Sequence, residues 1–326
     1  MPTSPSRRAV LGGLLATPAL DLPVLAQPSW PSRPIRVIVP STTGGFDVYV
    51  RMMAPRLAEL LGQPVVVDNR PGANGTIGAQ EVQRSPADGH TIMFGTVGAL
   101  TINISVYRNM PLDPVEDLAA IAIPVSSPMV WVVNPATPFH SLAELLARVK
   151  AEPGRWPYAL PSAGTITHLI VEDFKLRHGL DMPAVPYRGT PQAQVDVIAG
   201  QVPIMLDSVG AGYGHISGGR FRALATTGAE RSPRLPALPT MLELGLDPRE
   251  YLAWYAFMAP KATPPEVVLR LNRTINQVAR EPAIIARFEE LGAAPLTMTP
   301  AEVLAFMRAE RTRWGAIVRA GNIQAE

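Results

Sequence analysis

The sequence predicts an α/β protein with two similar lobes and a cleft between them. Short β-branched and aliphatic runs alternate with amphipathic stretches of helical period, which is typical of a parallel sheet covered by helices. This alternation begins near residue 35 and recurs after residue 128. The chain has 326 residues, enough for two domains that each bury their own core.

Residues 1–26 are expected to be an export signal and not part of the fold. Arg7 and Arg8 precede a short apolar run, and residues 24–26 suit a cleavage site. The arginine pair indicates either twin-arginine export or a general secretory signal that happens to carry two arginines. No later segment approaches roughly 18 uninterrupted apolar residues, so we expect a soluble periplasmic protein after cleavage.

The first elements of the mature chain lie on either side of a loop of small residues. The run IRVIVP at 35–40 is a buried-strand candidate, and a helix follows at 47–63 with Leu57 and Leu61 on its apolar face. Three more elements are expected in this half: a strand at 64–70, a glycine turn that enters a helix at 71–85, and a strand at 90–96.

The same alternation then recurs in a second segment. Ser141, with Glu144 three residues later, marks the start of a helix. The elements expected here are strands at 128–134, 158–160, 184–187, 203–208 and 221–227, and helices at 141–154, 167–179 and 191–201.

A proline-rich link at 231–241 leads to a strand at 253–260 and helices at 264–280 and 300–320. We assign residues 27–128 and 229–326 to lobe 1 and residues 129–228 to lobe 2. The chain would then cross between the lobes twice, near 121–130 and 226–232. Two such crossings form a hinge with a cleft between the lobes.

Composition and motifs exclude several functions. The net charge of +2 gives no basic stripe for nucleic acid, and the absence of cysteine excludes thiol chemistry and thiolate metal sites. There is no G-x-S-x-G elbow, no P-loop and no H-E-x-x-H motif, and the five histidines lack metal spacing. We therefore expect no cofactor, no metal and no assembled catalytic set.

Four loops at predicted strand ends share small, hydroxylated and glycine residues, and three of them precede a helix. Helix N-termini present unpaired N–H groups and a positive dipole end, so such loops can hold an anion without a charged side chain. Taken singly, each loop is equally or better explained as a tight turn. The loops are 41–47, 71–78, 95–103 and 161–168.

Two polar residues in these loops have an ordinary explanation beside a functional one. Asp47 is either a helix N-cap or first-turn acid, the commoner role, or an acceptor for a ligand amine or hydroxyl. His168 either lines the cleft or satisfies a local hydrogen bond at the start of its helix.

Several segments in order along the chain resemble the periplasmic solute receptors of the tripartite tricarboxylate transporter family, often called Bug-type receptors. The most specific are NRPGANGTIGA and LPALPTMLELG, and the resemblance covers about residues 30–326. It implies a type II periplasmic binding fold that closes around one small ligand. Members of this family usually bind carboxylates through backbone N–H groups and bridging waters.

The resemblance also implies a set of ligand contacts by position. In lobe 1 these are Thr43, Gly44, Gly45, Phe46, Asp47, Asn74, Gly75 and Thr96; in lobe 2 they are Ser162, Ala163, Gly164, Thr165 and His168, with Tyr187, Gly189 and Asp207 nearby. The chain departs from the family at STT before the glycine pair, at Ser162 in place of a glycine, and at Gln192 in place of a proline. These departures leave the identity of the ligand open.

The main hypothesis is a monomeric, exported, non-catalytic receptor for a small organic acid, with a membrane permease or a sensor protein as its partner. The alternative is an enzyme that acts on a small carboxylate on the same two-lobed scaffold, which the lack of a nucleophile–base set disfavours. A third hypothesis is a structural periplasmic protein that binds nothing.

Overall fold

One long strand, β4 (Leu118–Val133), belongs to both halves of the molecule. Its first part pairs antiparallel with β9 (Leu252–Pro260), and its last five residues pair antiparallel with β7 (Ile204–Ser208). The sequence predicted a strand only at 128–134. The observed strand begins ten residues earlier because the apolar segment 118–127 is almost entirely buried and continues in the extended conformation.

This computed structural model describes residue 1, residues 30–43 and residues 45–324. The expected export signal therefore lies, apart from Met1, outside the described residues, as does Gly44. The strand order across the continuous sheet is β2-β1-β3-β9-β4-β7-β5-β6, with β8 and β10 also paired to β4.

Lobe 1 is built on a parallel core of three strands with an antiparallel neighbour. Strand β1 (Ile35–Val39) pairs parallel with β2 (Val65–Asn69) and with β3 (Thr91–Thr96), and β3 pairs antiparallel with β9. Its other elements are α1 (Asp47–Leu61), η1 (Ala73–Gly75), α2 (Thr76–Gln83), η2 (Gly98–Ile102), α3 (Asn103–Val106), α4 (Pro114–Asp117), α9 (Pro265–Ala279), α10 (Pro282–Glu290), β10 (Ala294–Pro295) and α11 (Pro300–Ala320).

Lobe 2 repeats the parallel arrangement around β7. Strand β5 (Tyr158–Leu160) pairs parallel with both β6 (Ala184–Pro186) and β7. The remaining elements are α5 (Leu142–Ala151), α6 (Ile166–His178), α7 (Thr190–Ile198), α8 (Val209–Ser217) and β8 (Arg222–Thr226). Most predicted elements are found within a few residues of their expected bounds. The sequence analysis missed α8, whose sequence VGAGYGHIS holds three glycines, and α10.

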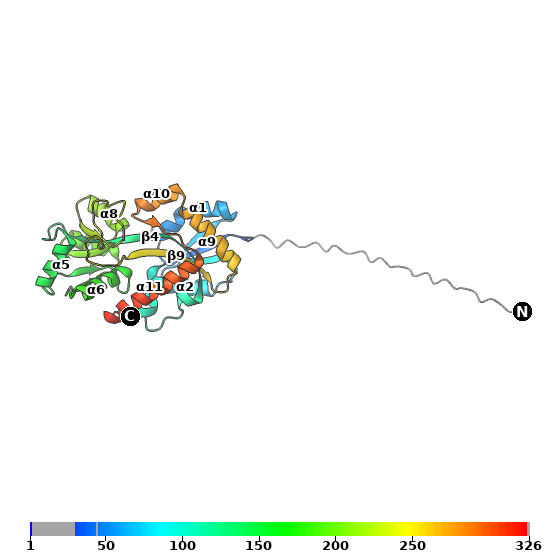
Figure 1. Cartoon of the computed structure of the whole chain (residues 1–326), viewed down its shortest axis with the longest axis horizontal. Helices are drawn as coiled ribbons and strands as arrows, with labels where there is room; N and C mark the ends of the chain where they lie inside the picture. Colours follow the sequence, from blue (N-terminus) through cyan, green and yellow to red (C-terminus); the bar gives the residue numbers. More distant parts are fainter. Residues whose placement is uncertain (2–29, 44, 325–326) are drawn as a thin grey trace.

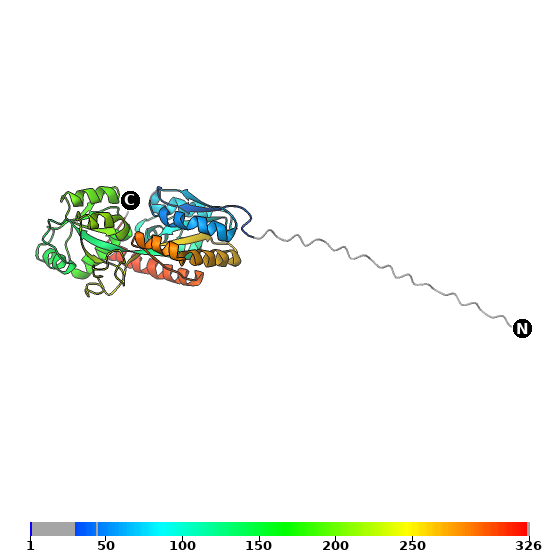
Figure 2. The ribbon, with the colours of Figure 1, turned by 90° about the horizontal axis from the view of Figure 1, so that it is seen from above.

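The two lobes are visible as separate groups of helices with β4 and β9 between them (Figure 1). The view from above shows the same separation (Figure 2). Helix α11, coloured red, runs from lobe 1 toward lobe 2 and contacts α6. Among residues 30–43 and 45–324, no helix is both long and apolar enough to cross a membrane.

The hydrophobic core continues through the hinge. One cluster of buried side chains includes Trp131 of β4, Trp254 of β9 and Trp314 of α11, all fully buried. A second cluster fills the other side of the lobe 1 sheet around Phe94, Phe257 and Phe288. Because the first cluster draws on both lobes, the crossing strands are held by packing as well as by their hydrogen bonds.

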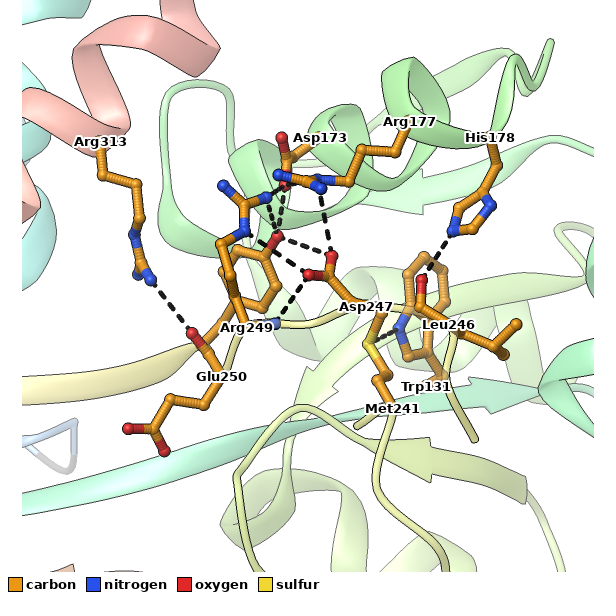
Figure 3. A network of polar contacts seen from close by, with 11 residues as sticks. Trp131, Asp173, Arg177, His178, Met241, Leu246, Asp247, Arg249, Glu250 and Arg313 are labelled. Atoms are coloured by element: carbon orange, nitrogen blue, oxygen red, sulfur yellow. Dashed lines mark hydrogen bonds and ion pairs between the residues drawn. The ribbon is translucent and has the colours of Figure 1, made fainter. Parts of the chain in front are cut away.

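A polar network joins α6 to the segment that leads back into β9 (Figure 3). The hydroxyl of Tyr251 is within hydrogen-bond distance of Asp173 of α6 and, at 2.9 Å, of Asp247, and it can donate its one hydrogen to either. Arg249 also donates to Asp173, and Arg313 of α11 donates to the carbonyl of Glu250 at 3.1 Å. The network therefore links elements of both lobes beside the second crossing strand.

The hydrogen bonds of residues 240–251 indicate where the chain returns to lobe 1. Met241 N–H donates to Thr226 O at 2.9 Å, and its sulfur accepts from the indole of Trp131. Leu246 O is 2.9 Å from a ring nitrogen of His178. These partners lie within 129–228, which favours a return at β9, later than the predicted 226–232. The exact division into lobes stays a prediction.

Candidate ligand-binding site

A cavity of about 400 Å³ lies between the two lobes. Its walls come from residues that follow β1, β2, β3, β5 and β6 and from the last residues of β7, together with residues of the two crossing strands. Carboxyl ends of parallel strands are the usual place for ligands in open α/β sheets. The wall residues are Pro40, Phe46, Gly72, Asn74, Gly75, Thr96, Val97 and Gly98 from lobe 1; Pro161, Ser162, Thr165, Ile166, Thr167, Gly189, Thr190, Leu206, Asp207 and Ser208 from lobe 2; and Met129, Ala253, Trp254 and Tyr255 from the crossing strands.

Five α-helices begin at this cavity, because the N-cap residue of each lies in its wall. These N-caps are Phe46 of α1, Gly75 of α2, Thr165 of α6, Gly189 of α7 and Ser208 of α8. Only the N-cap of α8 has a side-chain capping hydrogen bond. Of the helices that begin elsewhere, α5 and α11 have side-chain caps at Ser141 and Thr299, whereas α9 and α10 have none.

The consequence of these uncapped starts is electrostatic. The first N–H groups of a helix have no partner within the helix, and the dipole makes that end positive. In α1, α2, α6 and α7 no N-cap side chain occupies these donors. Helix starts from both lobes thus bring positive partial charge to one cavity.

The lobe 1 side of the wall is held in place by local hydrogen bonds and by glycine. The Asn74 amide donates to Asn103 Oδ1 at 2.8 Å, and the Asn103 amide donates back to Asn74 O at 3.0 Å. Gly75 has φ +96°, and a Cβ there would lie 2.6 Å from the Cβ of Ala99. Only glycine therefore fits the turn between η1 and α2.

Aromatic and aliphatic side chains make the apolar part of the wall. Phe46 stacks on Tyr255 with ring centroids 5.4 Å apart. The indole of Trp254 donates to Glu310 Oε2 at 3.0 Å, and Glu310 itself is buried. Burial raises the pKa of Tyr255, so its ring stays neutral. These rings give one part of the cavity an apolar surface.

Asp207 is the one carboxyl group among the described residues of the wall, which include no lysine, arginine or histidine. Its side chain is 3% exposed. Oδ2 accepts from Gln194 Nε2 at 2.7 Å, and Oδ1 accepts from Ser208 N–H at 2.8 Å. Burial raises the pKa of Asp207 to about 6, against the opposing effect of these two hydrogen bonds.

His168 supports a loop and is not in the wall. Its Nδ1 accepts from Gly164 N–H at 3.1 Å, and Nε2 lies 4.0 Å from Glu172 Oε1. Burial lowers the pKa of His168, partly offset by the charge of Glu172. The neutral ring thus fixes the loop at 161–165, the local role that the sequence analysis considered.

The structure places eight of the sixteen predicted contacts in the cavity wall: Phe46, Asn74, Gly75, Thr96, Ser162, Thr165, Gly189 and Asp207. Seven others lie outside it: Thr43, Gly45, Asp47, Ala163, Gly164, His168 and Tyr187. Gly44 is outside the described residues. That the wall residues contact a ligand stays a prediction.

The residues outside the wall have other contacts. Asp47 is a buried first-turn acid whose Oδ2 accepts from Arg51 Nε at 2.7 Å, and it lines a separate depression with Thr43. The Tyr187 hydroxyl donates to Asp196 at 2.9 Å. A Cβ on Gly164 would lie 3.0 Å from a methyl of Val106, so this loop touches lobe 1.

Sequence reasoning did not single out fourteen residues of the wall. Six of them, Gly72, Val97, Gly98, Pro161, Ile166 and Thr167, lie in the loops that it did select. The most important omission is Trp254 and Tyr255, which were interpreted as part of a core strand. No signal in the sequence pointed to them, because the second crossing was expected near 226–232. The pairing of β9 with β3 and β4 fixes the position of this strand, and its first residues line the cavity.

Comparison with known proteins gives consistent matches over nearly the whole chain. The sequence profile of the family described as "Tripartite tricarboxylate transporter family receptor" matches residues 49–323. "Protein BugT" of Bordetella pertussis is 39% identical over 313 residues, which is 95% of this chain and 96% of that protein.

Solved structures share the fold. "R. palustris Rpa4515 with adipate" has a TM-score of 0.81 at 34% identity and covers 90% of this chain and 99% of that one. "MatC (Rpa3494) from Rhodopseudomonas palustris with bound malate" has a TM-score of 0.76 at 26% identity and covers 89% of this chain and 100% of that one. The two-lobed α/β fold expected from the sequence is thereby confirmed.

Proposed function

Because the chain belongs to the tripartite tricarboxylate transporter receptor family, we propose that it captures a small organic carboxylate between its lobes. The observation that carries this proposal is the convergence of five helix N-caps on a cavity whose described wall contains no basic side chain. Such a wall suits an anion held by main-chain N–H groups.

The chemistry of the wall favours a carboxylate over a neutral ligand. Hydrogen bonds from N–H groups to an ionised oxygen are about twice as strong as those between neutral groups. They strengthen further where the effective dielectric constant is below that of water, as between two closing lobes. A neutral sugar or an amine would gain little from the same donors.

The size of the cavity and the ligands of two structural relatives agree with a small acid. A cavity of about 400 Å³ lies near the lower end of the usual range for small-molecule sites, roughly 300–1,000 Å³. The two relatives described above were solved with adipate and with malate. Both ligands are short dicarboxylates.

The chain would act outside the cytoplasm, as a monomeric periplasmic receptor that delivers its ligand to a permease or a sensor protein. Family membership and the segment at 1–26, which has the pattern of an export signal with an arginine pair, support this placement. An enzyme on this scaffold is the weaker alternative. The part of the chain that the structure describes holds no cluster of acidic residues and histidines that could bind a metal. The described wall also lacks a histidine or lysine that could activate a nucleophile.

Isothermal titration calorimetry of the purified mature protein with succinate, malate, adipate and a diamine tests this function. We expect one-to-one binding of at least one acid, no binding of the diamine, and recovery of the acid unchanged. Turnover of an acid would establish the enzyme instead. Absence of heat with every acid, or preference for the diamine, would refute a carboxylate receptor.

A further inference from the structure

Asp207 is an unexpected residue in a cavity built to hold an anion. Asp207 is a residue of the wall, directly before the N-cap of α8, and the residue is 3% exposed. Its carboxyl accepts hydrogen bonds from an amide and a main-chain N–H, and neither donor carries a charge. An ionised carboxylate here would repel a carboxylate ligand in the same cavity.

Resting on the proposed function, we propose that Asp207 meets the bound anion as a neutral carboxylic acid. Its O–H donates a hydrogen bond to the ligand carboxylate, so the site takes up one proton together with each anion. The proton comes from solvent, and no covalent bond is made or broken other than this O–H bond. The substrate class is therefore a carboxylate anion plus one proton, which makes Asp207 a specificity determinant.

Among the described residues, no charged group contributes to the shifted pKa of Asp207, so no cation keeps it ionised. Its strand β7 is flanked by β4, which carries no titratable residue, and by β5, and it packs against α6, α7 and α8. The Tyr158 hydroxyl on β5 donates to Glu172 of α6, and Asp196 of α7 accepts from Tyr187. The titratable residues of these elements are Tyr158 of β5; His168, Glu172, Asp173, Lys175, Arg177 and His178 of α6; Asp196 of α7; and Tyr213 and His215 of α8, with Tyr255 of β9 across the cavity.

These neighbours are neutral or already engaged. Burial lowers the pKa of His168 and of His215, so both rings are neutral near pH 7. The charge of Glu172 is shared with Lys175, 2.8 Å away. Burial is the leading cause of the raised pKa of Asp207, and its other causes are hydrogen bonds from Gln194 and Ser208, which oppose it. Geometry and charge thus favour the neutral acid once an anion lies beside it.

The direction of the pH dependence follows from linkage. Above a pKa of about 6 the free protein holds Asp207 mainly ionised, and binding must add a proton. Affinity should therefore rise as the pH falls, by up to about tenfold per pH unit between the pKa of the complex and that of the free protein. Below about pH 6 the dependence should level off.

The test is calorimetry with succinate, malate and adipate at several pH values, each in two buffers of different ionisation enthalpy. The expected result is uptake of close to one proton per ligand near pH 8, and affinity that increases toward pH 6. In Asp207→Asn the side chain stays neutral and keeps a donor, so we expect binding without pH dependence and without proton uptake. Asp196→Asn, the same change outside the wall, should behave like the wild type.

Two results would overturn the inference. Binding without proton uptake near pH 8 would show that Asp207 gains no proton when the anion binds. If folded Asp207→Asn does not bind and the affinity of the wild type rises with pH, an ionised Asp207 accepts a hydrogen bond from the ligand instead. If Asp207→Asn does not fold, proton uptake by the wild type still decides. Failure of every acid to bind would instead refute the proposed function, and the inference with it.

Discussion

The buried carboxyl of Asp207 should make the stability of the ligand-free protein depend on pH, and an asparagine should abolish that dependence. Burial raises its pKa from 3.8 to about 6. Since the folded-state pKa lies above the unfolded value, the stability that the neutral acid contributes is fully present below pH 3.8 and is lost as the pH rises through about 6.

The magnitude follows from the size of this shift. A shift of roughly two units corresponds to about 3 kcal/mol of unfolding free energy at high pH. About 2 kcal/mol of this is lost between about pH 4.5 and about pH 8. Asparagine also disturbs Gln194, whose amide donates to Asp207 and, at 3.3 Å, to Ala211 O. Loss of one of these hydrogen bonds costs about 1 kcal/mol.

Urea unfolding of the ligand-free wild type and Asp207→Asn at the two pH values tests the prediction. The two proteins should be about equally stable at the lower pH, and the variant should be about 2 kcal/mol more stable at the higher pH. Asp196→Asn is the control for a general effect of charge. A difference between wild type and Asp207→Asn that is the same at both pH values would refute the argument.

Three further predictions concern packing, a buried carboxylate and a helix cap. Gly292→Ala should lower the unfolding free energy in urea by about 2 kcal/mol more than Gly179→Ala. Both glycines have φ near +65°, but only at Gly292 would a Cβ lie 2.4 Å from a valine methyl of the other lobe, and equal losses of stability would contradict this. Glu310→Ala should cost about 3 kcal/mol or more and Glu310→Gln clearly less, because two buried indole N–H groups donate to this carboxylate; identical losses would show that its acceptor role is unimportant. Thr299→Ala should cost about 1 kcal/mol, because the side chain completes the capping box of α11, and thermal unfolding unchanged from the wild type would refute that role.

Much of the fold could be predicted from local pattern. Alternation of β-branched runs with amphipathic stretches located most strands and helices. Each element buries one face, and the spacing of the apolar residues on that face can be recognised in the sequence. Two features were not local. The length of β4 depends on pairing with β9, and the place of the second crossing, which stays a prediction, depends on contacts such as those of Met241 and Leu246 with residues 129–228. The sequence of residues 226–232 indicates neither the length of β4 nor a later crossing.

The candidate site was predictable to the extent that its residues follow strand ends. The glycine-rich turn at Asn74 and Gly75 lies in the wall because parallel strands bring their carboxyl ends together. Thr43 and Asp47 lie outside it because Asn69 donates to Ser41 O at 3.0 Å and Arg51 binds Asp47, which sets the direction of that loop. These are tertiary contacts, and no pattern in the loop itself specifies them.

Helix starts without side-chain caps have a consequence for how such a cavity responds to mutation. An amide belongs to the main chain, so replacing Thr167 or Thr190 by another residue leaves the N–H in place. Alanine scanning would therefore underestimate the groups that matter most for holding an anion, and ester replacement of single peptide bonds would expose them. For the same reason, side chains around the cavity can diverge and change which acid fits, while the main-chain N–H groups that bind its charge remain.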